Sequence, residues 1–436
     1  MHISILSVFP EMYQQFLNTS LVKRAQDAGQ VSITTHSFFS EVAPKKRIDA
    51  PTFGCGDGML LKPEIIEKAY NGATQNGKKK LFRVFFSPQG EKLNQHLLKE
   101  IYKKSTKCDG LLLVASRYEG MDARVEQEYA DMHVSVGDFV LMGGDLPAMM
   151  LTEGLLRLVP EVVGKESSVE QDSFSGPFVD YPEYTAPVEW KGLRVPDVIR
   201  SGDHKEVARW RKDQAVKKTV QQHFSWLRKH HLSDLEKIQC KKYMPAHYIA
   251  LCHSNVRIGP EKVSGTTSVT SMDIHDVARS SNTYGIDGFF IVTPLWDQQK
   301  IVQRFLSFWK SDHGAEYNRG RQESVSLVEV VIDLEKAIEV IEKKEGVRPI
   351  IVGTTAREFD LSLQRIHFDD QDKLWQKKKP ILFLFGTGKG FTDELLQKCD
   401  YLLAPITGLS TFNHLSVRSA IAIVLDRWLG IDQKYK

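Results

Sequence analysis

Four loops rich in glycine and proline are the part of this sequence best suited to chemistry. They span Phe53–Gly58, Ser87–Gly90, Ser116–Gly120 and Val136–Pro147, at the ends of strand-like segments. Because glycine lets the backbone approach a ligand and adopt tight turns, we expect these loops to hold a flat heterocycle with backbone amides and small apolar side chains. The alternative interpretation is that the loops are four ordinary turns. Four such loops at successive strand ends make this interpretation weaker than a single loop would. None of the loops has the GxGxxG or GxxxxGK[ST] pattern of common nucleotide sites.

A second chemical feature is a run of basic residues near the middle of the chain. Between Arg209 and Lys242 lie ten lysines and arginines against three acidic residues, although the net charge of the whole chain is only +3. Such a local excess is able to bind phosphates. A solvated helix surface explains the same pattern equally well, so charge alone leaves both interpretations open.

The cysteines and histidines do not indicate a metal site. The five cysteines are scattered and odd in number, which is typical of a reducing cytoplasm rather than of a disulfide framework. No Cys-x-x-Cys pair occurs, and His230-His231 near Cys240 lacks the spacing of zinc ligands. No apolar run reaches the roughly 18 residues that span a bilayer, and the first residues do not resemble a signal peptide. We therefore expect a cytoplasmic protein with no membrane partner.

The elements that must position these residues alternate between strand and helix. In the first 160 or so residues, short apolar runs alternate with amphipathic stretches, which predicts a parallel sheet. Ligands of such sheets bind beyond the carboxyl ends of the strands. The predicted strands are 2–9, 81–87 and 110–115, and the predicted helices are 11–28, 62–72 and 91–104.

The same alternation restarts after Pro245. A chain of 436 residues, 42% of them apolar, has material for several cores. We expect an α/β domain over 1–163, a linker or active-site loop over 164–183, a helical domain over 184–243 and a second α/β domain over 246–436. The last domain has predicted strands at 248–253, 288–293, 348–353, 380–385 and 401–405, and predicted helices at 274–284, 300–309, 327–345, 392–399 and 414–429.

The glycine loops also carry a family resemblance. Together with five shorter segments, in the same order and with similar spacing, they resemble the bacterial tRNA (guanine-N1)-methyltransferases, the TrmD family of the SPOUT superfamily. The resemblance extends to about residue 235, too far along the chain to be a chance similarity. The shorter segments are Ser7–Met12, Asp172–Phe174, Tyr184–Thr185, Ser201–His204 and Trp210–Arg211.

This resemblance implies how a cofactor binds. It implies a sheet tied in a deep trefoil knot, with S-adenosylmethionine bent inside it, and a homodimer whose active sites use both chains. The chain departs from the family pattern at Ile48–Phe53, at Gly54–Gly56 and at Ser116, which affects the contacts of the first loop. By carry-over, the cofactor-binding residues are Phe85, Ser87, Pro88, Ser116, Glu119, Gly120, Val136, Gly137, Asp138, Phe139, Val140, Leu141, Gly143, Gly144 and Pro147.

The implied reaction is methylation of guanine at N1. This nitrogen normally carries a proton, so transfer requires a general base. Negative charge then spreads to O6, where a cationic donor stabilises it. Asp172 matches the family's catalytic aspartate, Arg157 matches the arginine that stabilises the purine, and Asp180 matches a further functional aspartate. Without the resemblance, Asp172 is expected to be a solvated loop carboxylate or a helix N-cap.

The resemblance assigns the basic run to the anticodon stem of tRNA. Phosphate contacts would position the substrate, and contacts to a splayed base would specify it. The expected target is guanosine at position 37 of tRNA, preceded by another guanosine. Mg2+ is expected to be required, with no dedicated protein site. The candidate RNA-binding residues are Arg209, Arg211, Lys212, Lys217 and Lys218.

The last 190 or so residues resemble a second SPOUT RNA methyltransferase, of unassigned target. Asp273–Arg279 with Tyr284–Gly288 resembles the first SpoU motif, whose arginine assists ribose 2′-O-methylation. Arg279 is therefore the candidate catalytic residue, and an ion pair with Asp276 or Asp273 is its structural alternative. The other two motifs correspond to Leu384–Gly390 and Pro405–Ala420, and the candidate cofactor residues are Gly353, Gly386, Gly388, Ile406 and Leu415.

The predicted fold class is therefore α/β, with two SPOUT-type parallel-sheet domains, each with a deep trefoil knot, separated by a small all-helical domain. SpoU enzymes have Asn and Gly where this chain has Asp273 and His275. A non-catalytic dimerisation or RNA-docking module is thus the alternative for the C-terminal domain. For the whole chain the alternative is an S-adenosylmethionine-binding sensor, against which Asp172 and Arg157 argue.

Overall fold

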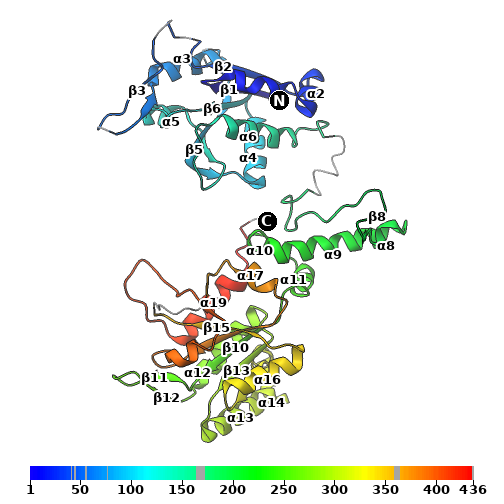
Figure 1. Cartoon of the computed structure of the whole chain (residues 1–436), viewed down its shortest axis with the longest axis vertical. Coiled ribbons are helices and arrows are strands. Elements are labelled where there is room, and N and C mark those ends of the chain that lie inside the picture. The colour runs from blue at the N-terminus through cyan, green and yellow to red at the C-terminus, as the bar shows by residue number, and fades with distance from the viewer. Residues whose placement is uncertain are drawn as a thin grey trace. The chain divides into compact units, whose positions relative to one another are not determined.

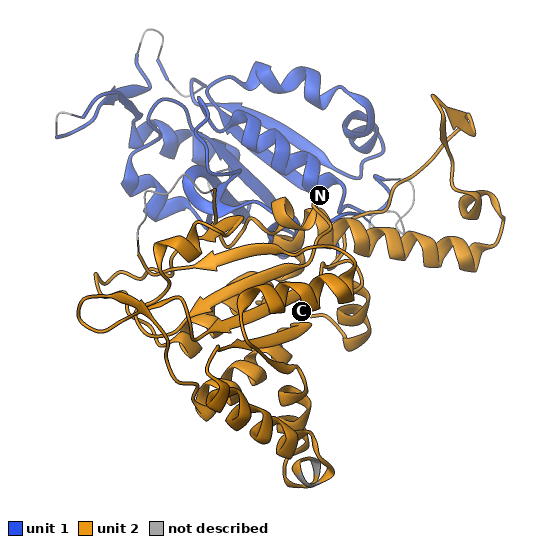
Figure 2. Ribbon diagram, turned by 60° about the horizontal axis from the view of Figure 1, so that its bottom comes forward, with its two compact units in different colours: residues 1–175 blue, residues 176–436 orange. Residues whose placement is uncertain are grey.

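The computed structural model describes residues 1–40, 42–43, 46–54, 56–75, 77–163, 172–357 and 364–434. It divides into two compact units, unit 1 over 1–175 and unit 2 over 176–436 (Figure 2). Each unit is an α/β structure with a parallel main sheet, as predicted. Part of the predicted linker, 164–171, lies outside the described residues, as does Cys55 of the first glycine loop.

Unit 1 is built on a five-stranded sheet in which all neighbouring strands are parallel. The central strand β6 is apolar throughout and buried on both faces, as expected in a parallel sheet. Its side chains alternate between two cores, with Leu111 and Leu113 in one and Leu112 and Val114 in the other. In sheet order the strands are β2 (Ser32–Ser37), β1 (His2–Ser7), β6 (Gly110–Ala115), β5 (Leu81–Lys92) and β7 (Met132–Ser135).

Helices cover both faces of this sheet (Figure 1). Leu97 of α4 and Leu151 of α6 lie in one core, whereas Ile65 of α3 and Val125 of α5 lie in the other. A short hairpin, β3–β4, stands outside the main sheet. The bounds are η1 Pro10–Tyr13, α1 Gln14–Leu17, α2 Ser20–Asp27, β3 Asp49–Pro51, β4 Met59–Leu61, α3 Pro63–Ala73, α4 Gln95–Ser105, α5 Ala123–Tyr129 and α6 Asp145–Leu156.

The predicted helix over 11–28 is wrong as a single element, because η1, α1 and α2 occupy it. The Asn18 side-chain amide donates to the Gln14 carbonyl (2.8 Å), and the Thr19 hydroxyl donates to the Gln15 carbonyl (2.5 Å). These side chains bind carbonyls near the end of α1 and favour a break there. The sequence pattern also missed β2 and β7, which are short and only partly buried.

Unit 2 contains a seven-stranded sheet, again parallel throughout. The five predicted strands are confirmed with small shifts of their ends. The predicted helix over 327–345 is wrong in its first part, where the valine-rich strand β14 pairs with β13; Asp333 then caps the helix α16 by accepting from the Lys336 amide (2.8 Å). In sheet order the strands are β14 (Val328–Val331), β13 (Gly288–Val292), β10 (His247–Cys252), β17 (Ile381–Gly386), β15 (Ile350–Thr354), β18 (Tyr401–Leu403) and β16 (Arg365–Ile366).

The helices of unit 2 pack on both faces of its sheet. Ile338 of α16 and Leu395 of α18 lie in one core, and Ile274 of α12, Val302 of α13 and Ile421 of α19 lie in the other. The bounds are α12 Ser271–Thr283, α13 Trp296–Lys310, α14 Asp312–Tyr317, α15 Arg319–Ser326, α16 Leu334–Glu345, α17 Gln371–Trp375, α18 Asp393–Leu396 and α19 Val417–Leu429, with a hairpin of β11 (Val256–Ile258) and β12 (Val263–Gly265).

The basic helical segment belongs to the same compact unit as the second sheet. Val216 and Val220 of α9 and Phe224 of α10 lie in one core cluster with Phe383 and Trp428. Helix α9 therefore buries one face and exposes the other. The proposed division into four domains stays a prediction. The segment contains β8 (Glu189–Trp190), β9 (Leu193–Arg194), α8 (Asp197–Arg200), α9 (His204–Gln222), α10 (Phe224–Leu227) and α11 (Asp234–Lys241).

A buried histidine connects three elements of unit 2. The indole nitrogens of Trp375 and Trp428 donate to His247 Nε2 at 3.3 and 3.1 Å, and His247 Nδ1 lies 2.7 Å from the Pro245 carbonyl. Because indole N–H groups only donate, His247 Nε2 is the acceptor and the proton sits on Nδ1. Burial lowers the pKa of His247 to about 3. The histidine thus stays neutral and ties α17 and α19 to β10. No described helix combines the length and the apolar character needed to cross a bilayer.

Candidate active sites

In unit 1 the loops that follow β6 and β7 close on each other. The Gly144 amide donates to the Ser116 carbonyl (2.8 Å), and Arg117 and Gly143 form an antiparallel bridge. A Cβ atom on Gly144 would lie 2.9 Å from the Ala115 Cα, so this approach requires glycine. Two of the predicted cofactor loops are therefore in direct contact.

The first glycine loop joins the same assembly through the β3–β4 hairpin. The Glu119 amide donates to the Met59 carbonyl, and the Leu61 amide donates to the Gly120 carbonyl, both at 3.1 Å. Gly58 has a positive φ of 100°, and a Cβ on it would lie 2.4 Å from Glu119 Cγ. The altered sequence of this loop does not prevent its contact with the third loop.

The predicted cofactor residues of unit 1 combine backbone-rich loops with exposed apolar side chains. Phe139 and Val140, in the loop after β7, are 55% and 82% exposed. Apolar side chains exposed beside backbone amides fit a flat ring such as adenine. Phe85, Gly144 and Pro147 are buried behind the loops, Ser87, Ser116, Gly120, Val136, Gly137 and Gly143 are half-buried, and Pro88, Glu119, Asp138 and Leu141 are exposed.

A buried ion pair holds these loops. Asp145, 1% exposed, begins α6 and accepts from Arg117 Nε (2.7 Å), from the Ser7 hydroxyl (2.5 Å) and from the Tyr13 hydroxyl (3.0 Å). Burial, with the Asp145 carboxylate adding to it, raises the pKa of Tyr13. The Arg117 guanidinium also lies over the Phe9 ring, 5.0 Å from its centroid. Arg117 and Asp145 were not predicted as functional residues, although both lie inside the glycine loops.

Two of the predicted catalytic residues form an ion pair. The guanidinium of Arg157, which follows α6, donates to the carboxylate of Asp172. Their side chains are 48% and 31% exposed, so both are accessible. Asp180 belongs to unit 2, where its carboxylate accepts from the Tyr181 amide (2.8 Å).

Unit 2 contains a cavity of about 820 Å³ at the carboxyl edge of its sheet. Four of the predicted cofactor residues line it, namely Gly386, Gly388, Ile406 and Leu415. Gly353 is not among the lining residues; it lies in β15, where a Cβ would meet Cys399 Sγ at 2.8 Å. The Thr267 and Thr387 hydroxyls bond at 2.5 Å in the cavity wall.

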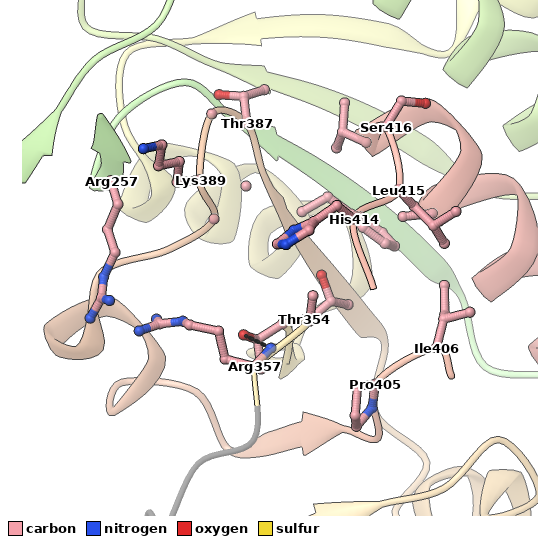
Figure 3. A pocket seen from close by; sticks show the side chains of 18 of the residues that line it. Arg257, Thr354, Arg357, Thr387, Lys389, Pro405, Ile406, His414, Leu415 and Ser416 are labelled. Atoms are coloured by element: carbon pink, nitrogen blue, oxygen red, sulfur yellow. Dashed lines mark hydrogen bonds between the residues drawn. The ribbon is translucent and has the colours of Figure 1, made fainter. Parts of the chain in front are cut away.

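The cavity has two chemically different sides. Figure 3 shows the cationic ends of Arg257, Arg357 and Lys389 on one side, opposite Ile406 and Leu415. An apolar wall next to backbone-rich glycine loops fits an adenosine group, so the residues present fit S-adenosylmethionine. Sequence reasoning missed the cations, because they come from separate loops without a common motif.

The first SpoU-like motif contributes Asp273 to the cavity lining, whereas Arg279 is exposed on α12 and is not a lining residue. Arg418 pairs with Asp273 (3.3 Å) and with Asp276 (3.0 Å). Arg279 has no ion pair with any residue that the structure describes. The structure therefore does not contain the alternative ion pair of Arg279 with Asp273 or Asp276.

The basic candidates on α9 differ in their partners. Arg209 lies 3.8 Å from Glu206, and Arg211 lies 3.8 Å from Glu183 and over the Tyr181 ring. Among these candidates, the exposed lysines Lys212, Lys217 and Lys218 have no ion pair within the described residues. Within the described ranges, no group of three or more His, Cys, Asp and Glu residues is arranged to hold a metal ion.

Two parallel-sheet units, each with glycine loops at the carboxyl edge, define an α/β protein of a class whose ligands usually bind at that edge. Comparison with known proteins then identifies the family. Residues 1–229 match the family model "tRNA (Guanine-1)-methyltransferase TrmD", and residues 246–430 match "SAM-dependent RNA methyltransferase". The chain belongs to the TrmD tRNA (guanine-1)-methyltransferase family, and both matches imply S-adenosylmethionine as methyl donor.

Some relatives match this chain over nearly its whole length. Two proteins named tRNA (guanine-N(1)-)-methyltransferase, from Nitratidesulfovibrio vulgaris and Oleidesulfovibrio alaskensis, are each 35% identical and cover 99% of both chains. One of the same name from Carboxydothermus hydrogenoformans is 38% identical over 239 residues, which is 55% of this chain and 92% of that protein. The predicted family and tRNA methyltransferase activity are thus confirmed.

We expect Asp145→Asn to destabilise unit 1 by about 3–5 kcal/mol, because it leaves Arg117 without its buried counter-charge. Urea unfolding measures this change. The control is Asp138→Asn, which breaks the exposed ion pair with Lys92 and should cost under about 1 kcal/mol. Equal losses in the two variants would show that Asp145 does not hold the loops.

Proposed function

We propose that the N-terminal region methylates N1 of guanosine 37 in tRNA, with Asp172 as the general base and Arg157 as the cationic donor. The observation that carries this proposal is the ion pair between these two accessible side chains. It places a hydrogen-bond acceptor beside a donor. Asp180 is proposed to assist, in line with the family resemblance.

The pair is complementary to one edge of guanine. Guanine presents N1–H, a donor, next to O6, an acceptor, so Asp172 would accept the N1 proton while Arg157 donates to O6. As the proton moves to the carboxylate, N1 gains the electron pair that forms the new bond to carbon, and Arg157 stabilises the charge on O6. S-adenosylmethionine, when bound, would supply the methyl group from its sulfonium. The sulfur keeps the electron pair of the broken bond to carbon and leaves as a neutral thioether.

The residues proposed to bind the cofactor of the N-terminal region lie in its glycine loops. The exposed Phe139, Val140 and Leu141 would cover the adenosine, and the Gly143–Gly144 contact with Ser116 would form the backbone wall. We further propose the trefoil knot and the homodimer that the family resemblance implies. The contact between the loops after β6 and β7 supports the knot, because a knotted chain requires such close passage.

We expect Asp172→Asn to lower the methyl-transfer rate by about 10²–10⁴-fold, because asparagine keeps the size of the side chain but cannot accept the proton. Formation of 1-methylguanosine is measured by nucleoside mass spectrometry, and cofactor affinity by calorimetry, which should stay near normal. Asp27→Asn, an exposed carboxylate on α2, is the matched control. Wild-type rates in Asp172→Asn would remove the residue from the mechanism.

We propose that α9 binds the anticodon stem through phosphate contacts. Its exposed lysines Lys212, Lys217 and Lys218 support this, because none of them forms an ion pair with a described residue. Arg209 and Arg211 lie on the same helix and would add to the positive surface.

Charge reversal at Lys217 and Lys218 should weaken tRNA binding and flatten its salt dependence by roughly 0.9 per lost phosphate contact. The slope of the logarithm of affinity against the logarithm of salt concentration is the measurement. Reversal at Lys343 and Lys379, exposed lysines elsewhere in unit 2, is the control. A slope that changes equally in both variants would favour a merely solvated helix surface.

We propose that the C-terminal domain is a second S-adenosylmethionine-dependent RNA methyltransferase, acting on a ribose 2′-hydroxyl, with Arg279 as its candidate catalytic residue. The cavity supports the cofactor part of this proposal. The position of Arg279 outside the lining requires that it reach a site other than the cavity described, such as that of a second copy of the chain.

We expect the full chain to bind two equivalents of S-adenosylmethionine, and Leu415→Glu to lose one of them, because it places a charge in the apolar wall. Calorimetry counts the sites. Leu409→Glu introduces the same charge in the same loop, outside the cavity lining, and should keep both. A single site in the wild type would favour the non-catalytic docking module.

A further inference from the structure

The cavity of unit 2 contains more positive charge than a bound S-adenosylmethionine could neutralise. Its described lining includes four basic side chains, from Arg257, Lys262, Arg357 and Lys389, against the single carboxylate of Asp273. S-adenosylmethionine itself carries a sulfonium and an ammonium group against one carboxylate, so it is a net cation. Asp393, which binds two of these arginines, adds a second carboxylate. Four cations against two carboxylates leave an excess of two positive charges, which this cofactor does not neutralise and which suits a separate anion.

The four cations come from three separate segments that line one cavity. Arg257 and Lys262 belong to the β11–β12 hairpin, Arg357 follows β15, and Lys389 follows β17. The Lys389 amide donates to the Arg257 carbonyl (3.0 Å), which fixes the hairpin against the β17 loop. Asp393 accepts from Arg257 (2.7 Å) and from Arg357 (3.1 Å). One carboxylate thus holds two guanidinium groups side by side.

The local field at this rim is positive. Burial, followed by the neighbouring Arg257 guanidinium, lowers the pKa of Arg357. Lys262 and Lys389 are exposed, and neither has an ion pair with a described residue. Cations that line a cavity without an internal counter-charge are suited to an external anion.

The rim lies opposite the apolar wall that would hold the adenosine. Figure 3 shows His414 between Lys389 and the arginines on one side and Ile406 and Leu415 on the other. An anion on the rim would therefore lie beside the cofactor, where a substrate has to enter. Paired guanidinium groups bind a phosphate through several N–H bonds, and flexible lysines extend the contact along a phosphate chain.

We propose that Arg257, Lys262, Arg357 and Lys389 form a phosphate-binding rim that holds the sugar-phosphate backbone of the RNA substrate of the C-terminal domain beside its cofactor. This inference rests on the proposed function of that domain. The occupant is single-stranded RNA, because the contact runs from a group of cations at the rim into a cavity, which favours a strand whose nucleotide is free to enter.

The test uses the full chain and a fluorescein-labelled oligouridylate of about eight nucleotides, which is too short to form an anticodon stem. The main variant is Lys262→Gln with Lys389→Gln, because neither side chain has an internal ion pair to break. Fluorescence anisotropy should give a several-fold weaker affinity and a salt slope lower by about 0.7 per lysine. Arg257→Gln is a second variant, expected to weaken binding further.

A matched double variant removes the same charge elsewhere, namely Lys343→Gln with Lys379→Gln on the far surface of unit 2. It should bind the oligonucleotide as the wild type does. Equal loss in this control, or no loss in the rim variant, overturns the proposal.

Calorimetry with S-adenosylmethionine separates the remaining outcomes. The rim variant should keep both cofactor sites. Loss of one cofactor site with unchanged oligonucleotide binding would assign the rim to the cofactor carboxylate and overturn the proposal. The wild type could instead bind only one equivalent of cofactor while the rim lysines still determine its affinity for the oligonucleotide. That outcome would support the rim and contradict the proposed second methyltransferase.

Discussion

Parallel pairing between strands far apart in the sequence is the constraint on which both sites depend. In unit 1, β1 pairs with β6, and in unit 2, β10 pairs with β17. Parallel strands point the same way, so the loops that follow them meet at one edge of the sheet. The glycine loops of unit 1 and the cavity of unit 2 both form at this edge. Neither site could be assembled from neighbouring segments alone.

Each unit uses a carboxylate to hold arginines that come from distant loops. In unit 1 the buried Asp145 binds Arg117, and the pair fixes the loops behind the proposed cofactor site. In unit 2 Asp393, 42% exposed, binds Arg257 and Arg357 at a cavity wall. The Asp145 carboxylate is buried, so its ion pair with Arg117 serves to position the loops. A pair at an open cavity keeps its guanidinium groups available to one.

Some strands could be predicted from the sequence and others could not. Strand β6 is a continuous apolar run, and its bounds were predicted to the residue, because a strand buried on both faces has a strong local signal. Strand β2 was missed because it is at the sheet edge and partly polar, and β14 was merged into a helix because it is short and adjoins α16. The roles of Arg157 and Asp172 were predicted only through the family resemblance, since an aspartate in a loop has no local signature of a base. Their ion pair was not predicted.

The sequence by itself determined the α/β class, the second α/β region, the glycine loops and the family, because these depend on local patterns of residue type and spacing. Only the tertiary structure decided that Arg117 is held by Asp145 and that α9 shares a core with the C-terminal sheet. It also brought Arg257, Arg357 and Lys389 together opposite Ile406 and Leu415. These arrangements depend on which strands pair and on which loops then lie side by side. Residues in separate loops that share no pattern of residue type give no sequence signal of their contact.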